Sequence, residues 1–392
     1  MLPFRNVTER QVNPAGIGKA GVGEERNTAK NPHDIPPIRN GDSPVDSARL
    51  DSSAFREERG VIDPALMTFL LDPASYGQPG GSVTLIESHM SFIFLIGDRA
   101  YKMKKPMKLD LLDNLALAQR HENCLKELRL NRVMSPDIYL DVIPVTVDPE
   151  GGFRIGGSGE TVEWLVVMRH LNKDRLLDQA IPAETVTAQH ISDLAEILDN
   201  FYRQTEQVAM DKADVIANIH SLLDRNEQSL RNPDFGLLPT FVEPILRTVR
   251  GLLNDNHDLI LARAEQGWIR DCHGDLRPEH VHLGPPVRLI DRLEFNDRLR
   301  WHDPFEEIAD LGLECERLGA PWIYPMLVKE LTCRLGVGIS KNLLDFYAGL
   351  HGCVRARLAI EHLRYQPELA EYRREQTVDG LRLVAKYACR QL

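Results

Sequence analysis

The chain has 392 residues, of which 43% are hydrophobic and 27% are charged. This is ordinary globular composition with length for two or three packed units, so collagen, wholesale disorder and a small disulfide-rich domain are excluded. The 47 Lys and Arg side chains are outnumbered by 58 Asp and Glu, which gives a formal charge of −11. That sign argues against a nucleic acid as the main partner.

Neither a membrane nor an oxidising compartment is indicated. The longest apolar runs, such as residues 92–96, fall far short of the ~20 residues that a membrane span needs, and the N-terminus has no apolar leader pattern. The six cysteines include no C-x-x-C pair, which favours buried reduced thiols over a disulfide framework or a zinc ribbon. We therefore expect a cytoplasmic protein with no membrane partner.

Residues 1–60 differ in composition from the rest of the chain. They contain six Pro, six Gly and only two aromatic residues, with 9 basic and 9 acidic side chains. Such a segment buries little apolar surface, so we predict a disordered N-terminal tail. The whole net charge then falls on residues 61–392.

The remaining chain changes from strand-like to helical periodicity. Apolar β-type runs at 83–86, 92–96 and 99–103, with a Gly97-Asp98 turn, predict an antiparallel meander, followed by an amphipathic helix at 114–132. Two further strands are predicted at 138–145 and 162–168. Helical patterns then cover 187–208, 212–230, 239–266, 304–318, 322–334, 341–363 and 367–390. We predict an α+β protein with a small β-rich lobe at 61–170 and a large helical lobe at 171–392.

The most informative segment surrounds Asp275. His273-Gly-Asp275-Leu is followed, sixteen residues after Asp275 and beyond an apolar strand, by Asp291. Kinase-like active sites present two carboxylates in this way: the first orients the acceptor hydroxyl, and the second binds the Mg²⁺ that bridges the nucleotide phosphates. The apolar residues between them predict a β-hairpin that holds the two carboxylates close together.

Several other short segments accompany this motif, in the order and at the spacing found in one protein family. They are residues 71–76, 87–91, 100–106, 130–132, 136–139 and 294–301. With them, residues 65–370 resemble the aminoglycoside phosphotransferase family, which has a two-lobed protein-kinase-like fold. The most similar members are bacterial proteins that are sometimes fused to a P-loop kinase domain. We expect no such domain here, because the chain ends at Leu392.

The resemblance implies roles for individual residues. Lys102 falls where the strand lysine contacts the α- and β-phosphates of ATP, with Lys104 of the same strand parity as an alternative, and Glu127 is placed to pair with the lysine. Met168 falls at the hinge beside adenine, and Ser88 in the loop over the phosphates. His273 resembles a residue that braces the catalytic loop, and Asp310 a structural carboxylate that supports it.

His280 departs from the family pattern. The family has Asn, an oxygen ligand for Mg²⁺, five residues after the catalytic Asp, and this chain has imidazole, which suits Zn²⁺ or Mn²⁺ better. We expect His280 to join Asp291 as a metal ligand with altered preference, with Glu294 and Asn296 near enough in sequence to compensate. A separate zinc site at Cys272, His273, His280 and His282 is disfavoured, because no second half-site is evident.

Each of these residues could instead have a purely structural role or lie on the solvated surface. The two aspartates could be buried structural carboxylates, and Lys102 and Glu127 could be solvated surface residues. The interpretation that we adopt is a phosphotransferase that depends on ATP and Mg²⁺, or Mn²⁺, and acts on a hydroxyl of an unidentified small molecule. The alternatives are a nucleotide-binding pseudokinase without turnover and an interaction protein with a vestigial cleft.

Overall fold

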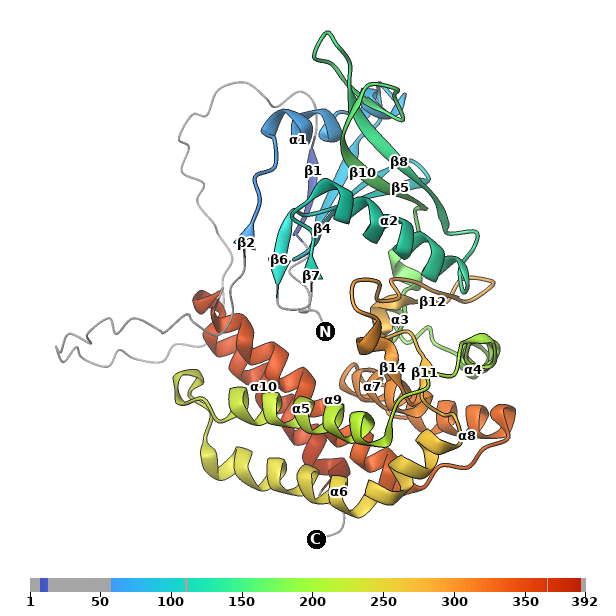
Figure 1. Cartoon of the computed structure of the whole chain (residues 1–392), viewed down its shortest axis with the longest axis vertical. Coiled ribbons are helices and arrows are strands. Elements are labelled where there is room, and N and C mark those ends of the chain that lie inside the picture. The colour runs from blue at the N-terminus through green and yellow to red at the C-terminus, as the bar shows by residue number, and fades with distance from the viewer. Residues whose placement is uncertain (1–7, 13–57, 110–111, 365, 389–392) are drawn as a thin grey trace, which may run out of the picture.

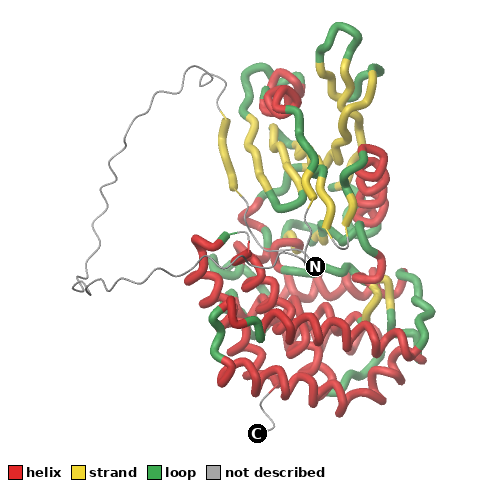
Figure 2. Tube along the Cα trace, turned by 60° about the vertical axis from the view of Figure 1, so that its left-hand side comes forward, coloured by secondary structure: helices red, strands yellow, loops and turns green. Residues whose placement is uncertain are grey.

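The protein folds into two lobes (Figure 1). The structure, a computed structural model, describes residues 8–12, 58–109, 112–364 and 366–388. The smaller lobe is built on an antiparallel sheet, and the larger lobe consists almost entirely of helices (Figure 2). The two-lobed α+β architecture predicted from the sequence is confirmed.

The main sheet of the small lobe has the strand order β1-β3-β4-β5-β10-β8-β9, and each neighbouring pair is antiparallel. Its strands are β1 (Thr8–Val12), β3 (Val83–Glu87), β4 (Ser91–Ile96), β5 (Arg99–Lys104), β8 (Tyr139–Val147), β9 (Phe153–Ile155) and β10 (Glu160–Arg169). The predicted turn joins β4 to β5, with Gly97 at φ 53°. This left-handed conformation is easily reached by glycine and suits a tight hairpin.

Two short segments within residues 1–60, the predicted disordered tail, form strands. Strand β1 forms an edge of the main sheet and pairs with β3, from Thr8 opposite Glu87 to Val12 opposite Val83. Strand β2 (Glu58–Arg59) pairs with β6 (Met107–Leu109), which pairs in turn with β7 (Leu112–Asp113). Pairing at a sheet edge satisfies backbone groups and needs no core-forming side chain, so composition does not reveal it. The rest of the predicted tail lies outside the described residues.

Two helices flank the sheet. Helix α1 (Pro64–Leu71), followed by the 3₁₀ turn η3 (Pro73–Tyr76), buries Leu66 and Leu70 in the core of the small lobe. Helix α2 (Leu117–Arg132) packs Cys124 and Leu128 against β8 and β10. This packing directs the middle of α2 toward β5, and so places an α2 carboxylate beside the strand lysines.

The large lobe contains the helices that the sequence predicts, with boundaries within a few residues. They are α3 (Leu177–Ala180), α4 (Ala188–Gln204), α5 (Lys212–Leu230), α6 (Pro239–Glu265), α7 (Pro304–Arg317), α8 (Ile323–Leu335), α9 (Lys341–Glu361) and α10 (Ala370–Ala388). Only the four-residue α3 has no predicted counterpart. Helix α9 is buried along most of its length and packs against α5, α6, α7 and α10.

Short strands and 3₁₀ turns lie between the helices of the large lobe, and those from β11 to η7 surround the motif residues. They are the strands β11 (Arg270–Asp271), β12 (Val281–His282), β13 (Arg288–Leu289) and β14 (Trp301–His302) and the 3₁₀ turns η4 (Lys173–Arg175), η5 (Pro233–Phe235), η6 (Pro278–His280), η7 (Asp297–Arg300), η8 (His362–Arg364) and η9 (Pro367–Leu369). Among the described residues, none of the helices combines the length and the apolar character that crossing a membrane would require.

Candidate active site

The two aspartates of the motif lie at the same end of a hairpin, as predicted. Strands β12 and β13 pair with Val281 opposite Leu289. The loop before β12 carries Asp275, and the residue after Ile290 is Asp291. Both aspartates line a cavity of about 1220 Å³ whose walls come from both lobes. The hairpin therefore converts a separation of sixteen residues into neighbouring positions on one wall.

A glycine and a histidine shape the loop at residues 273–277, which carries Asp275 and which the family resemblance identifies as the catalytic loop. Gly274 has φ 84°, and a Cβ atom there would lie 2.7 Å from Cγ of Arg300, so a side chain is excluded on two grounds. The Nε2 atom of His273 lies 3.0 Å from the backbone oxygen of Ile290, next to Asp291. Burial lowers the pKa of His273 to about 3, so the ring is neutral. His273 thus braces the loop, as the sequence implies.

The carboxylate that supports the loop backbone belongs to Glu307, one helical turn before the expected Asp310. Glu307 accepts the backbone N–H groups of His273 at 3.0 Å and of Gly274 at 3.1 Å, and the hydroxyl of Tyr202 at 2.6 Å. Both acids lie in α7, and sequence spacing alone does not separate them. The role assigned to Asp310 therefore falls to Glu307.

Asp310 acts on the site through an arginine. Its carboxylate is paired by two contacts with Arg355 of α9, one of them 2.8 Å long, and Arg355 approaches an oxygen of Asp275 at 3.7 Å. Burial raises the pKa of Asp275, but the charges of Arg277, His280 and Arg355 outweigh it and lower the pKa below its usual range. Asp275 is therefore ionised at neutral pH.

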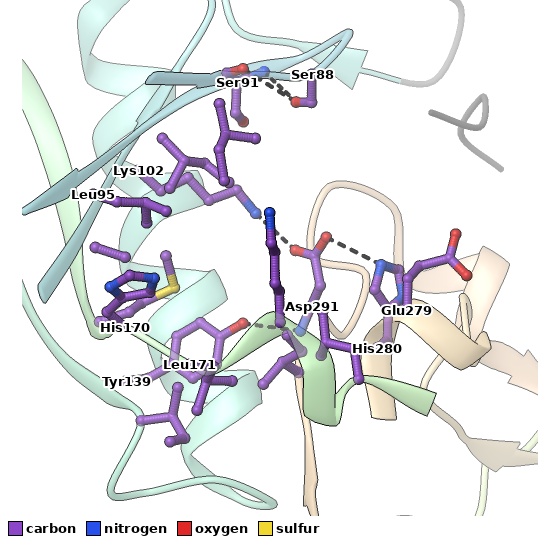
Figure 3. Close-up of a pocket in the computed structure, with 18 of the residues that line it drawn as sticks. Ser88, Ser91, Leu95, Lys102, Tyr139, His170, Leu171, Glu279, His280 and Asp291 are labelled. Atoms are coloured by element: carbon purple, nitrogen blue, oxygen red, sulfur yellow. Dashed lines mark hydrogen bonds and ion pairs between the residues drawn. The ribbon is translucent and has the colours of Figure 1, made fainter. Parts of the chain in front are cut away.

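Asp291 adopts an unusual backbone conformation. Its φ is 61°, in the left-handed region that costs energy for a residue other than glycine. Its N–H donates to the hydroxyl of Tyr139 at 2.9 Å, and its carboxylate lies 2.7 Å from Nζ of Lys102 (Figure 3). Burial raises the pKa of Asp291, but Lys102 and then His280 lower it below the ordinary value. The strained turn thus points an ionised carboxylate into the cavity.

Lys102 and Lys104 share one carboxylate. Glu127 of α2 binds Lys102 through one oxygen at 2.8 Å and Lys104 through the other at 2.6 Å. Lys104 also pairs with Glu294 at 2.5 Å, and Lys102 with Asp291. The predicted pairing of Lys102 with Glu127 is therefore present, and neither residue is on the solvated surface. Lys102 is the lysine that reaches the candidate metal ligand, whereas Lys104 is sealed between two glutamates.

His280 lies between the two aspartates. Its Nδ1 is 2.7 Å from the backbone oxygen of Asp275, and its Nε2 is 3.5 Å from a carboxylate oxygen of Asp291. A carbonyl oxygen only accepts, so Nδ1 carries the hydrogen, and Nε2 is the ring nitrogen that faces Asp291. The residues expected to compensate are occupied elsewhere: Glu294 pairs with Lys104, and Asn296 caps η7 by accepting the N–H of Arg298 at 3.0 Å.

The cavity continues toward the sheet. Ser88 and Met168 both line it, as do the apolar side chains of Leu95, Ala100, Ile138, Leu171 and Ile290 (Figure 3). Ser88 closes the turn between β3 and β4, where its hydroxyl accepts the N–H of Ser91 at 3.0 Å. Glu127 does not line the cavity but lies behind Lys102. The structure therefore brings all the predicted site residues to one cavity or to the side chains directly behind it.

A second group of possible metal ligands lies beneath the catalytic loop. Among the described residues, Cys272, His302 and Glu307 offer ligand atoms within 4.8 Å of one another. Both oxygens of Glu307 already accept hydrogen bonds from the loop and from Tyr202. The group therefore has a structural explanation that needs no ion. The disfavoured cluster of Cys272 with His273, His280 and His282 is not among the groups that the described residues form.

Comparison with known proteins adds to this geometry. No protein-family model matches the chain. It is 28% identical over 291 residues to uncharacterized proteins of Mycobacterium tuberculosis and Mycobacterium bovis, which covers 72% of this chain and 56% of theirs, so the chain spans about half the length of these relatives. It is 24% identical over 233 residues to an aminoglycoside 3'-phosphotransferase of Streptomyces ribosidificus, covering 54% of this chain and 85% of that protein. The chain resembles aminoglycoside phosphotransferases.

Comparison with solved structures gives two further similarities. A choline/ethanolamine kinase family protein from Mesorhizobium loti has a TM-score of 0.49 and 12% identity, covering 82% of this chain and 95% of that one. An aminoglycoside-3'-phosphotransferase of type VIII has a TM-score of 0.42 and 19% identity, covering 72% of this chain and 98% of that one.

Proposed function

We propose that this protein is a phosphotransferase that moves the terminal phosphoryl group of ATP to a hydroxyl group of a small molecule. The observation that carries the proposal is the contact of Lys102 with both Glu127 and Asp291, at 2.8 and 2.7 Å, at the cavity that also holds Asp275. Phosphoryl transfer needs a cation for the phosphates, a carboxylate for the metal and a carboxylate for the acceptor. These side chains supply all three.

The sheet side of the cavity suits the nucleotide. Adenine would lie among the apolar side chains near Met168, at the end of β10, and the loop at Ser88 would cover the phosphates. Glu127 holds Lys102 in one orientation before the nucleotide arrives. Phosphate binding therefore loses little side-chain entropy. Lys104 binds the other oxygen of Glu127 and so fixes the carboxylate that orients Lys102.

Asp291 and His280 fit a divalent cation. Nε2 lies 3.5 Å from a carboxylate oxygen of Asp291, so both atoms would be ligands of a cation bound between them. A cation held there supplies charge neutralisation for the phosphates. Because one of its two ligands is an imidazole, the pair should favour Mn²⁺ over Mg²⁺. Tyr139 and Lys102 fix the orientation of Asp291 from behind.

Asp275 is placed to position the acceptor. It is ionised, it lines the cavity, and the hairpin holds it near Asp291. Its carboxylate would accept the hydrogen bond of the attacking hydroxyl and so direct the hydroxyl oxygen at phosphorus. With a low pKa, Asp275 contributes more by orientation than as a strong base, which suits a loose transition state for phosphoryl transfer.

The test is transfer of labelled γ-phosphate from ATP, with Mg²⁺ or Mn²⁺, to a mixture of small hydroxyl metabolites. Asp275→Asn should abolish transfer and change affinity for the metal–nucleotide complex by no more than about threefold, whereas Asp291→Asn should lower both. Asp148→Asn, which alters a surface pair with Arg154, is the matched control. ATP binding that is independent of metal and unaffected in both active-site variants would favour the pseudokinase alternative instead. No binding of ATP at all would favour the interaction protein.

A further inference from the structure

A buried arginine lies directly beside the carboxylate proposed to hold the acceptor. Nε of Arg277 is 3.2 Å from Oδ1 of Asp275, and its Nη1 is 3.0 Å from a carboxylate oxygen of Glu279. The Arg277 side chain is only 8% exposed, yet Arg277 and Glu279 both line the cavity (Figure 3 labels Glu279). Any molecule whose hydroxyl reaches Asp275 must therefore come into contact with a guanidinium group.

Binding of the acceptor would disturb this ion pair. A hydroxyl that donates to Asp275 competes with Arg277 for the same carboxylate. Arg355, which also approaches Asp275, is already held by Asp310 in α7. Arg277 stays paired with Glu279, but weakening its contact with Asp275 in a buried site carries a desolvation cost unless another anion replaces that contact. The acceptor itself is the molecule that can bring the replacement.

The chemistry of guanidinium selects the kind of group. Arginine presents parallel N–H donors that match a carboxylate or a phosphate, and it repels an ammonium group. An acceptor with an amino group next to the reacting hydroxyl would place two cations together. An acceptor with an acid group there would exchange one ion pair for another.

We propose that the acceptor carries a carboxylate or a phosphate beside the hydroxyl that is phosphorylated, and that Arg277 binds this group. The inference rests on the proposed phosphotransferase function and deepens it, because it assigns the acceptor to the class of anionic hydroxyl compounds. Glu279 would hold the guanidinium in place while the Asp275 carboxylate accepts the hydrogen bond of the acceptor hydroxyl. Arg277 is then a specificity-determining residue.

The experiment compares four probes with the same three-carbon skeleton: glycerate, glycerol 3-phosphate, glycerol and serinol, whose charges run from negative through neutral to positive. The full chain is first loaded with a non-hydrolysable ATP analogue and Mn²⁺, and binding of each probe is measured by calorimetry or ligand-observed NMR. At least one of the two anions should bind about tenfold more tightly than glycerol, and serinol should bind most weakly. The tighter anion distinguishes carboxylate from phosphate.

Variants test whether Arg277 causes the tighter binding of the anionic probes. Arg277→Gln should remove the advantage of the anions, Arg277→Lys should keep part of it, and Arg382→Gln, at an exposed pair with Asp379, should leave it unchanged. Anions that bind no more tightly than glycerol to the wild-type chain would overturn the inference, as would a preference that persists in Arg277→Gln. Comparing the four probes on the wild-type chain tests the inference even if a variant does not fold. Failure to bind the ATP analogue would instead contradict the phosphotransferase function itself.

Discussion

The Nε2 atom of His280 lies 3.5 Å from a carboxylate oxygen of Asp291. The opposite ring nitrogen is 2.7 Å from the backbone oxygen of Asp275, which obliges that nitrogen to carry the hydrogen. Nε2 is thus the ring nitrogen that faces the carboxylate of Asp291. Histidine ligands of metals are commonly oriented by such a hydrogen bond at the other ring nitrogen, so this arrangement suits a pair of cation ligands.

The first prediction concerns metal preference. Because Mg²⁺ prefers oxygen ligands, the wild-type chain should show stronger nucleotide-dependent thermal stabilisation and faster transfer with Mn²⁺, and His280→Asn should shift both toward Mg²⁺. Titrations of each metal at constant ATP measure the effect. His257→Asn, at an exposed position, serves as the control. An unchanged ratio of the two metals in His280→Asn would remove His280 from the metal site.

The second prediction separates the two lysines that share Glu127. Lys104 lies between Glu127 and Glu294 and is almost fully buried, so Lys104→Met should lower the free energy of unfolding by about 3 kcal/mol, because two buried carboxylates lose a partner. Lys102→Met should instead reduce the stabilisation that ATP confers. Urea unfolding with and without nucleotide measures both effects.

The control for these lysines is Lys108→Met, at an exposed pair with Asp113, which should change stability by less than about 0.5 kcal/mol. If Lys104→Met abolishes the effect of ATP while Lys102→Met leaves it intact, Lys104 and not Lys102 contacts the phosphates. In that case the assignment along β5 is wrong by two residues.

The third prediction tests the loop conformation at Gly274. Gly274→Ala should destabilise the protein by about 1–3 kcal/mol and sharply reduce transfer, because the residue has φ 84° and the new Cβ would meet Arg300 at 2.7 Å. Thermal melting and the transfer assay measure the two effects. Gly338→Ala is the matched control, since a Cβ there would meet no atom within 4 Å and its backbone is not left-handed. Equal effects of the two substitutions would show that the loop does not need a glycine.

The fourth prediction is a pH dependence of stability set by His351. Burial lowers the pKa of this histidine, but hydrogen bonds to Asp310 and Glu306 outweigh it and raise the pKa from 6.5 to about 9. Glu306 and Asp310 of α7 face the ring of His351. Arg355, four residues further along α9, pairs with Asp310. A raised pKa in the folded state means that the stabilisation is complete below pH 6.5 and is lost as the pH rises through about 9.

The size of this effect is at most about 3 kcal/mol. Urea unfolding at intervals from pH 6 to pH 9.5 should show the loss in the wild-type chain and a flatter profile in His351→Gln. His257→Gln, which changes an exposed histidine, should keep the wild-type profile. A His351→Gln profile as steep as that of the wild type would mean that other groups cause the pH dependence.

Local patterns predicted most of the elements and the two aspartates of the motif. Hydrophobic periodicity depends on neighbours within a few residues, so the large helices and the meander are recognisable in the sequence. The residues of the His273 motif are adjacent in the chain, so the sequence also predicts the loop that carries Asp275. Strand β1 was missed because a paired sheet edge leaves no mark in composition. Glu307 was missed in favour of Asp310 because only packing shows which turn of α7 faces the loop.

The order of the elements, the acidic net charge and the residue types proposed for phosphoryl transfer all follow from the amino-acid sequence read locally. Which charged side chains lie next to one another depends on the tertiary structure. Lys102 and Asp291 are 189 residues apart and lie 2.7 Å from each other, and Arg355 approaches Asp275 from a helix near the end of the chain. Such pairs depend on how the lobes and α9 pack, and ion pairing at short range is sensitive to distances of a few ångströms that no local pattern encodes.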